Sequence, residues 1–301
     1  MKMKIYNLIL IFLSGCIVIT SCNKNVNLLD ENNKSVYLDA SNSANIKVID
    51  VFAGNSPVLP TAQSQLYSGP QFFIYANGVK LNGTALGYIN GNTFTLPLAA
   101  SNPLANPNAI GLLFPITNVY ANVAAGATRF DLILSRLNLG VVPNVPSFIA
   151  GDTLITFNTT LIPGKNYSMY IGDTIPTYKV TFKEDDLSAT PAYQTYKIRL
   201  ANFLMDPLER ITLFSRRQNA EIISDISHKN VSDWVQLPLP IISDTLEIRK
   251  TGTAVTYITV QGTASQSPTF APTGMRMYTV IARGKTGLIA KAPSASIIIN
   301  R

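Results

Sequence analysis

The chain has 301 residues, 47% of them apolar and only 14% charged, and its formal net charge is +7. This length provides enough chain for one large core or two ordinary ones. One His and two Cys exclude metal sites built on those side chains. Average domains contain about 25% charged residues. Because helix surfaces need many Glu, Lys, Gln and Arg residues, this composition indicates an all-β protein.

The first 22 residues have the pattern of a secretory signal. Lys2 and Lys4 precede an apolar run over residues 5–18, and Ile19-Thr20-Ser21-Cys22 closes the segment. These last four residues resemble the lipobox of bacterial lipoproteins. The resemblance implies that Cys22 is acylated, for example with palmitate, and becomes the mature N-terminus. We therefore expect a lipid-anchored protein of the cell envelope, attached to the outer membrane.

Two alternatives bear on this segment. Leu13-Ser14-Gly15-Cys16 is a second lipobox, but cleavage there leaves an apolar run behind the lipid, whereas cleavage at Cys22 leaves the polar residues 23–25. An uncleaved membrane helix would need about 20 apolar residues, and residues 5–20 are too few. A flexible tether over residues 23–43 follows. Acidic residues are missing directly after Cys22, which favours the periplasmic over the surface face of the membrane.

Short apolar runs separated by Gly, Asn and Pro fill the rest of the chain, a pattern typical of antiparallel β-sandwiches. Residues 72–75, Asn77-Gly78 and residues 79–81 predict a hairpin, because Asn-Gly accepts the positive φ angles of a two-residue turn. The other expected strands are residues 46–52, 93–96, 112–114, 129–134, 153–157, 167–171, 178–182, 196–200, 211–214, 235–237, 245–248, 255–260, 277–282 and 295–299.

The order of these segments repeats. Residues 157–172 match 270–284, with Tyr-Ser or Tyr-Thr before an alternating strand that ends in Gly, and residues 46–52 match 197–203. We therefore expect two tandem immunoglobulin-like sandwich domains, 44–183 and 195–301. The charged and Pro-containing residues 184–194 are the expected linker.

The opening strand, the hairpin and the final Tyr278-Thr279-Val280-Ile281-Ala282-Arg283-Gly284 strand resemble the domain of unknown function 4397 of exported Bacteroidota lipoproteins. Residues 196–287 carry the resemblance best, and residues 167–172 carry it in the first unit. The first unit departs from it by long insertions, among them residues 99–107 and 137–150. The resemblance implies an immunoglobulin-like sandwich. It brings no catalytic residue.

Residues for catalysis are scarce. His228 lies in a polar segment and is expected at the surface, and no Gly-x-Ser-x-Gly nucleophile motif occurs. The one acidic cluster, Glu184-Asp185-Asp186, fits a solvated linker better than a cation site. We expect no enzyme activity, no metal and no cofactor.

The candidate binding residues lie in the second domain. From residue 191 onwards, 13 Lys and Arg stand against seven Asp and Glu. Arg216 and Arg217 could pair with anionic groups, although a merely solubilising charge excess explains them as well. Trp234, the single tryptophan, either stacks on a sugar or packs in the core at the start of a strand, and we favour the core.

The function expected from the sequence is a non-catalytic binding or scaffolding module. Its partners would be the membrane, through the anchor, and a glycan or another envelope protein, but not nucleic acid. The alternative is a fimbrial or adhesin-type subunit that assembles by strand exchange. In that case the apolar residues 295–299 would be donated to a neighbouring subunit. We favour their being the last strand of their own domain.

Overall fold

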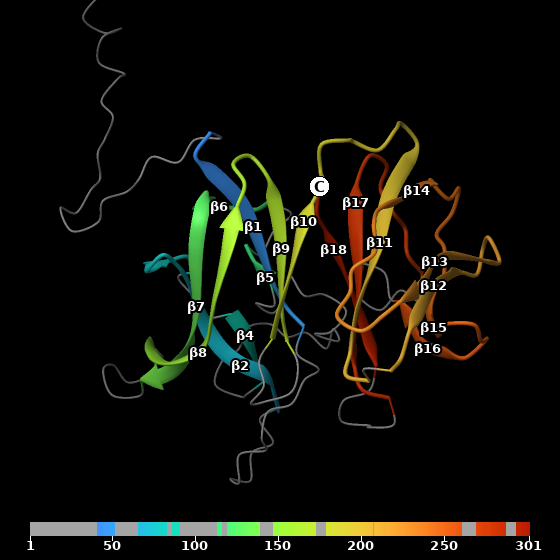
Figure 1. Ribbon diagram of the computed structural model, residues 1–301. Coiled ribbons are helices and arrows are strands. Elements are labelled where there is room, and N and C mark those ends of the chain that lie inside the picture. Colours follow the sequence, from blue (N-terminus) through green and yellow to red (C-terminus); the bar gives the residue numbers. More distant parts are fainter. Residues whose placement is uncertain are drawn as a thin grey trace, which may run out of the picture. The chain divides into compact units, whose positions relative to one another are not determined.

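The computed structural model describes residues 41–51, 66–82, 86–90, 113–115, 119–138, 147–172, 179–206, 208–260, 269–286 and 293–301. Every regular element in these ranges is a β-strand, and the strands form four sheets (Figure 1). The all-β sandwich architecture expected from the composition is confirmed. The expected strand at residues 93–96 lies outside the described residues.

The first sandwich consists of two sheets. One has the order β10-β9-β1-β5 with β6 also paired to β1, and the other has the order β3-β2-β7-β8 with β4 also paired to β2. The strand bounds are β1 Ser43–Asp50, β2 Leu66–Ala76, β3 Val79–Lys80, β4 Leu86–Asn90, β5 Leu113–Phe114, β6 Ala121–Ala124, β7 Gly126–Asn138, β8 Ser147–Leu161, β9 Asn166–Gly172 and β10 Lys179–Asp185.

The second sandwich also consists of two sheets, with the orders β14-β11-β17-β18 and β13-β12-β15-β16. The strand bounds are β11 Thr195–Leu204, β12 Ile211–Ser215, β13 Ala220–Ile226, β14 Val235–Pro238, β15 Leu246–Lys250, β16 Thr256–Val260, β17 Met277–Gly284 and β18 Ser294–Ile299. β18 pairs antiparallel with β17 of its own sheet. The interpretation of residues 295–299 as the domain's own last strand is therefore confirmed.

The two sandwiches are built alike. Each contains one parallel pair, β1 with β9 and β11 with β17, which the purely antiparallel expectation did not include. The two pairs have the same register, since Lys47 lies opposite Ser168 and Arg199 lies opposite Thr279. The repeat seen in the sequence is thus present in the pairing of the strands, but the match of residues 46–52 with 197–203 is off by one, because Lys47 corresponds to Arg199 and not to Ile198.

Two tyrosines fix equivalent turns. The Tyr167 hydroxyl accepts a hydrogen bond from the Ile162 amide at 3.1 Å, and the Tyr278 hydroxyl accepts one from the Thr273 amide at 2.8 Å. In each case a buried tyrosine at the start of a strand holds the amide five residues before it. The shared Tyr-Ser/Thr motif therefore stabilises the turn that leads into β9 or β17.

The expected hairpin is also present. β2 and β3 are joined by Asn77 and Gly78, whose φ angles are 48° and 81°. Positive φ at both central residues belongs to the turn type whose twist matches that of antiparallel strands, and Asn-Gly adopts it at low cost.

Each sandwich has its own apolar core. The first includes Ile46, Phe72 and Phe130, and the second includes Leu200, Leu213 and Val280. A third apolar cluster joins the two sandwiches. It contains Ile49, Val51, Leu113 and Tyr170 from the first sandwich and Ala201, Phe203, Ile281 and Ile298 from the second.

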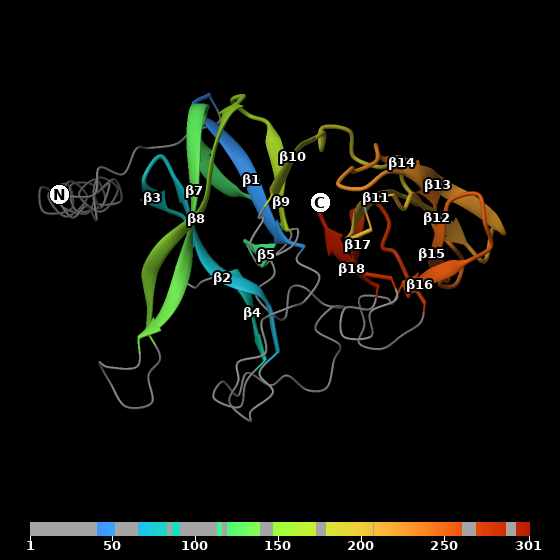
Figure 2. The same ribbon diagram turned by 60° about the horizontal axis from the view of Figure 1, so that its bottom comes forward.

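This third cluster means that β1, β9, β11, β17 and β18 are covered on both faces. Both views show β1 and β9 on the side of the first sandwich nearest to β17 and β18 (Figures 1 and 2). We call this contact between the two sheets the junction. Residues 38–301 form one compact unit, and the boundaries drawn for two domains stay a prediction. Glu184 and Asp185, assigned above to the linker, extend β10.

Candidate functional site

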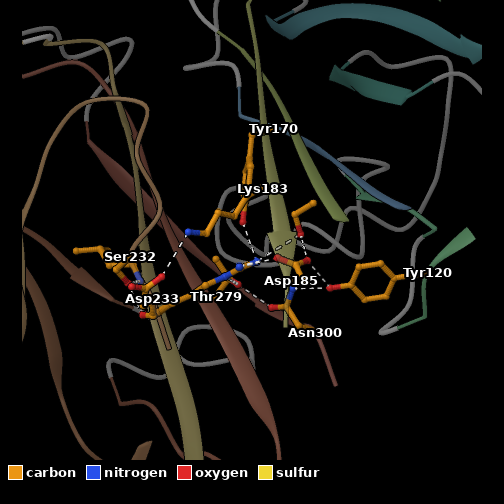
Figure 3. A network of polar contacts seen from close by, with 11 residues as sticks. Tyr120, Tyr170, Lys183, Asp185, Ser232, Asp233, Thr279 and Asn300 are labelled. Carbon is orange, nitrogen blue, oxygen red and sulfur yellow. Dashed lines mark hydrogen bonds and ion pairs between the residues drawn. The ribbon is translucent and has the colours of Figure 1, made fainter. Parts of the chain in front are cut away.

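A buried ion pair occupies the junction. Asp185 is the last residue of β10, and Arg199 lies in β11 of the other sandwich. The guanidinium Nη1 lies 2.6 Å from the carboxylate Oδ1, and the two side chains are 1% and 0% exposed (Figure 3). Charges removed from water in this way are stabilised only when both are paired and hydrogen-bonded.

Hydrogen bonds complete the pairing of both ions. The Asp185 carboxylate Oδ2 accepts from the Ser168 hydroxyl at 2.5 Å and from the Tyr120 hydroxyl at 2.7 Å. Arg199 Nη2 donates to the Tyr170 hydroxyl at 3.1 Å and to the Ser168 hydroxyl at 3.4 Å. Burial raises the pKa of Tyr170 to about 12, the nearby Arg199 opposing the rise, so Tyr170 stays a neutral partner at physiological pH.

The network continues into the second sandwich. Arg199 Nε donates to the Thr279 hydroxyl at 2.8 Å, which donates to the Asn300 side-chain oxygen at 2.6 Å. The Asn300 side-chain amide in turn donates to the Tyr120 hydroxyl at 3.0 Å. The chain of bonds starts and ends on the first sandwich, so it ties the two sandwiches at several points (Figure 3).

Lys47 is a second buried cation near this network. Its ammonium donates to the Ile299 backbone carbonyl at 3.0 Å and lies 4.7 Å from the centre of the Tyr120 ring. Burial lowers the pKa of Lys47 to about 8; the Asp185 carboxylate opposes this shift and the Arg199 guanidinium adds to it. Lys47 therefore crosses from one sandwich to the other, as Arg199 does in the opposite direction.

Arg283 makes a further crossing contact. Its guanidinium donates to the Asp50 backbone carbonyl at 3.2 Å and to the Ser296 hydroxyl at 2.9 Å. Burial lowers its pKa to about 10, partly offset by the Asp50 carboxylate. Three cations from β1, β11 and β17 thus lie in the junction, and each binds an oxygen of the opposite sandwich.

Trp234 belongs to this junction and not to the apolar core of the second sandwich. The Arg199 guanidinium carbon lies 4.3 Å from the centre of its ring, a cation–π contact, and the ring is half-buried. Next to it, Asp233 forms an ion pair with Lys183 of β10 at 3.4 Å. The favoured interpretation of Trp234 as a core residue is wrong, because the ring covers a buried charge.

Arg216 and Arg217 lie elsewhere, in the turn after β12. Arg216 forms an ion pair with Glu247, which also binds Arg249 at 2.6 Å. Burial raises the pKa of Glu247, but the hydrogen bonds from Arg249 and Arg216 outweigh it and lower the pKa overall. The Arg217 side chain is exposed, and its amide donates to Asp244 Oδ1 at 3.1 Å.

The three candidate binding residues therefore do not form one site. Trp234 contacts the junction side of β11, whereas Arg216 pairs with β15 in the other sheet of the second sandwich, across its core. Among the arginines of the second sandwich, Arg199 and Arg283 are buried in the junction, and Arg210, Arg216 and Arg249 form ion pairs with carboxylates. Arg217 keeps an exposed guanidinium.

The acidic cluster and the single histidine also lie at or near the junction. Asp185 is buried, while Glu184 binds Lys165 at 2.9 Å and Asp186 accepts from the Ser188 amide at 3.0 Å. The interpretation of this cluster as a wholly solvated linker is wrong for Asp185, because its partner arrives from the second sandwich. Within the described residues, no group of three His, Cys, Asp or Glu could hold a metal ion.

His228 lines a small, shallow groove along the junction. Val51, Gly172 and Lys179 of the first sandwich and Phe203 and Lys229 of the second form its other walls. A Cβ atom on Gly172 would lie 2.7 Å from the Val51 side chain, so glycine permits the close approach of strands here.

Comparisons with known proteins are sparse. No family model matches the chain, and no curated protein matches it, so the resemblance to the domain of unknown function 4397 stays a prediction. Among solved structures, a candidate cell adhesion protein from Bacteroides uniformis is 9% identical with a TM-score of 0.22; the match covers 87% of this chain and 98% of that one.

The Bacillus anthracis TIE protein is 8% identical with a TM-score of 0.19, over 81% of this chain. The chain spans about a third of the length of that protein, 33%. Similarities of this size carry no argument about function.

Cys22 and the alternative Cys16 lie outside the described residues. In the part of the chain that is described, no helix is long and apolar enough to cross a membrane. Sequence reasoning missed the junction, although one signal was present. Lys47 and Arg199 are cations at matching positions, each between two apolar residues of its strand.

Proposed function

We propose that the chain is a non-catalytic, lipid-anchored protein of the bacterial cell envelope, in which two sandwiches are locked together into one binding or scaffolding module. The locking of the two sandwiches rests on the buried Asp185–Arg199 pair, with side chains 0% and 1% exposed, and the anchoring rests on the lipobox-like residues 19–22. Domains that move freely expose a polar surface to each other. A fully desolvated ion pair between two sandwiches instead serves to fix their arrangement.

The polar groups of the junction also support a non-catalytic role. Asp185, Ser168, Tyr120 and Arg199 bind one another and are closely packed between two sheets. A catalytic acid or base needs access to a substrate atom within hydrogen-bond reach. These groups instead bind one another across the junction, which leaves them no access to a substrate.

The anchor is tested by metabolic labelling with an alkyne analogue of palmitate. We expect label on the full chain and on the Cys16→Ala variant, but none on Cys22→Ala. Label that is retained in Cys22→Ala and lost in Cys16→Ala would move the anchor to Cys16. An unlabelled wild-type chain recovered in the soluble fraction would overturn the envelope proposal.

The binding role is tested with the full chain on an array of bacterial and plant glycans. Arg217→Ala removes the exposed guanidinium, and Arg210→Ala is the matched control because Arg210 is already paired with Asp225. Binding to acidic glycans that only Arg217→Ala weakens would make a glycan the ligand. If no glycan on the array binds, a glycan is not the ligand. Envelope proteins captured by cross-linking in whole cells would then be the candidates.

A further inference from the structure

Large apolar side chains gather at one end of the second sandwich. Three loops meet there, where β11 begins, β14 ends and β17 begins. The loops expose four large hydrophobic residues to solvent: Tyr193 (81% exposed), Ile241 (93%), Ile242 (74%) and Met275 (50%). We call these four residues the apolar tips. Apolar side chains that are clustered in this way mark interaction sites.

Backbone contacts hold the loops beside one another. The Leu239 amide donates to the Gln194 carbonyl at 2.8 Å, and the Met275 amide donates to the Thr195 carbonyl at 2.7 Å. Gln194 and Met275 adopt φ angles of 59° and 62°, which are uncommon for residues other than Gly, Asn and Asp. The loops therefore keep a costly conformation in which the apolar tips point outward.

β1 begins at this same end. Lys47, in the second half of β1, contacts the carbonyl of Ile299, which pairs with Tyr278 near the start of β17. Arg283, at the other end of β17, contacts Asp50 at the end of β1. β1 and β17 thus run in the same direction, so β1 begins at the end of the compact unit where the apolar tips lie.

Positive charge lies next to the apolar tips. Arg276 follows Met275, and Asp244, two residues after Ile242, accepts from the amide of Arg217. The exposed guanidinium of Arg217 therefore belongs to the same end of the sandwich. Tyrosine and arginine beside aliphatic tips are the composition of segments that lie in the headgroup region of a membrane.

We propose that the apolar tips insert into the headgroup region of a bilayer that contains anionic lipids, at the end of the compact unit where β1 begins; this rests on the proposed envelope anchoring. The strength with which such a surface binds a membrane grows with the apolar area that it buries and with its attraction to anionic lipids. Docking would also fix which end of the module faces the membrane.

The test uses the full acylated chain in vesicles of phosphatidylcholine and phosphatidylglycerol, with brominated lipids as the fluorescence quencher. Ile242→Trp reports on the apolar tips. Leu208→Trp is the matched control, because Leu208 is 94% exposed in the loop at the opposite end of β11. The native Trp234, stacked on Arg199, supplies the baseline in the wild-type chain.

We expect the added indole of Ile242→Trp to lose emission with brominated lipids and to shift to shorter wavelength, and that of Leu208→Trp to do neither. The loss should diminish in vesicles without phosphatidylglycerol. Equal emission of both variants in floating vesicles would overturn docking and leave the anchor intact. A chain that fails to float with the vesicles would overturn the anchor and docking together.

Discussion

Replacing Asp185 by asparagine isolates the charge in the junction. The substitution keeps the size of the side chain and its capacity to accept from the Ser168 and Tyr120 hydroxyls, but it leaves Arg199 buried without a counter-ion. Removing one partner of a buried ion pair costs about 3–5 kcal/mol, because the remaining charge stays desolvated. Both side chains here are at most 1% exposed, so we expect a loss in this range.

The assay is urea unfolding of the full chain, monitored by the fluorescence of Trp234. This single tryptophan stacks on Arg199 and therefore reports directly on the junction. Asp225→Asn is the control, because Asp225 pairs with Arg210 at the surface. It should leave the urea midpoint unchanged, since exposed pairs contribute little.

A double variant that removes both charges tests whether the loss in Asp185→Asn comes from the unpaired charge of Arg199. Asp185→Leu combined with Arg199→Met removes both charges, and replacing a buried pair by apolar side chains is often neutral or stabilising. The double variant should therefore be more stable than Asp185→Asn. A loss below about 1 kcal/mol for Asp185→Asn, the value of a solvated pair, would refute a closed, dry junction.

Three further changes test other parts of the structure. Burial lowers the pKa of Lys47 from 10.5 to about 8, so between these pH values the unfolded chain holds a proton that the folded chain releases. The free energy of unfolding should then rise from pH 8 to 10 by about 2–3 kcal/mol relative to Lys47→Met; equal pH profiles in urea titrations would contradict the burial of Lys47. Tyr278→Phe removes the hydroxyl that accepts from the Thr273 amide, and thermal unfolding should show a loss of about 1 kcal/mol, matched by Tyr167→Phe in the equivalent turn. Deletion of residues 294–301 removes β18, whose Ile297 and Ile298 are buried on opposite faces. We expect circular dichroism to show no folded protein. A truncated chain that folds would instead support the alternative in which residues 295–299 are donated to a neighbouring subunit.

Local patterns in the sequence were enough to predict much of the fold. Low charge and short apolar runs indicated the all-β class, and Asn77-Gly78 located a hairpin turn that the structure contains. β13 was missed because Ala220–Ile226 mixes apolar with charged residues, which suits its position at the edge of a sheet. The parallel pairs were missed because their partners are more than 70 residues apart.

The junction could not be predicted from local pattern. Asp185 stands between Glu184 and Asp186, and a run of three acidic residues predicts a segment exposed to solvent. Asp185 is buried because a sheet of the other sandwich packs against it. Trp234 likewise covers Arg199 only because the strands meet in space. The matching positions of Lys47 and Arg199, each between two apolar residues, were the available signal, because a cation that is buried with its apolar neighbours requires a polar partner.

Calorimetric unfolding of the full chain tests most directly whether the two sandwiches act as one module. A junction with a desolvated ion pair and a shared apolar cluster predicts a single cooperative transition in the wild-type chain. Asp185→Asn should weaken this coupling and separate the transitions. Two independent transitions in the wild-type chain would contradict the account, because each sandwich would then unfold without the other.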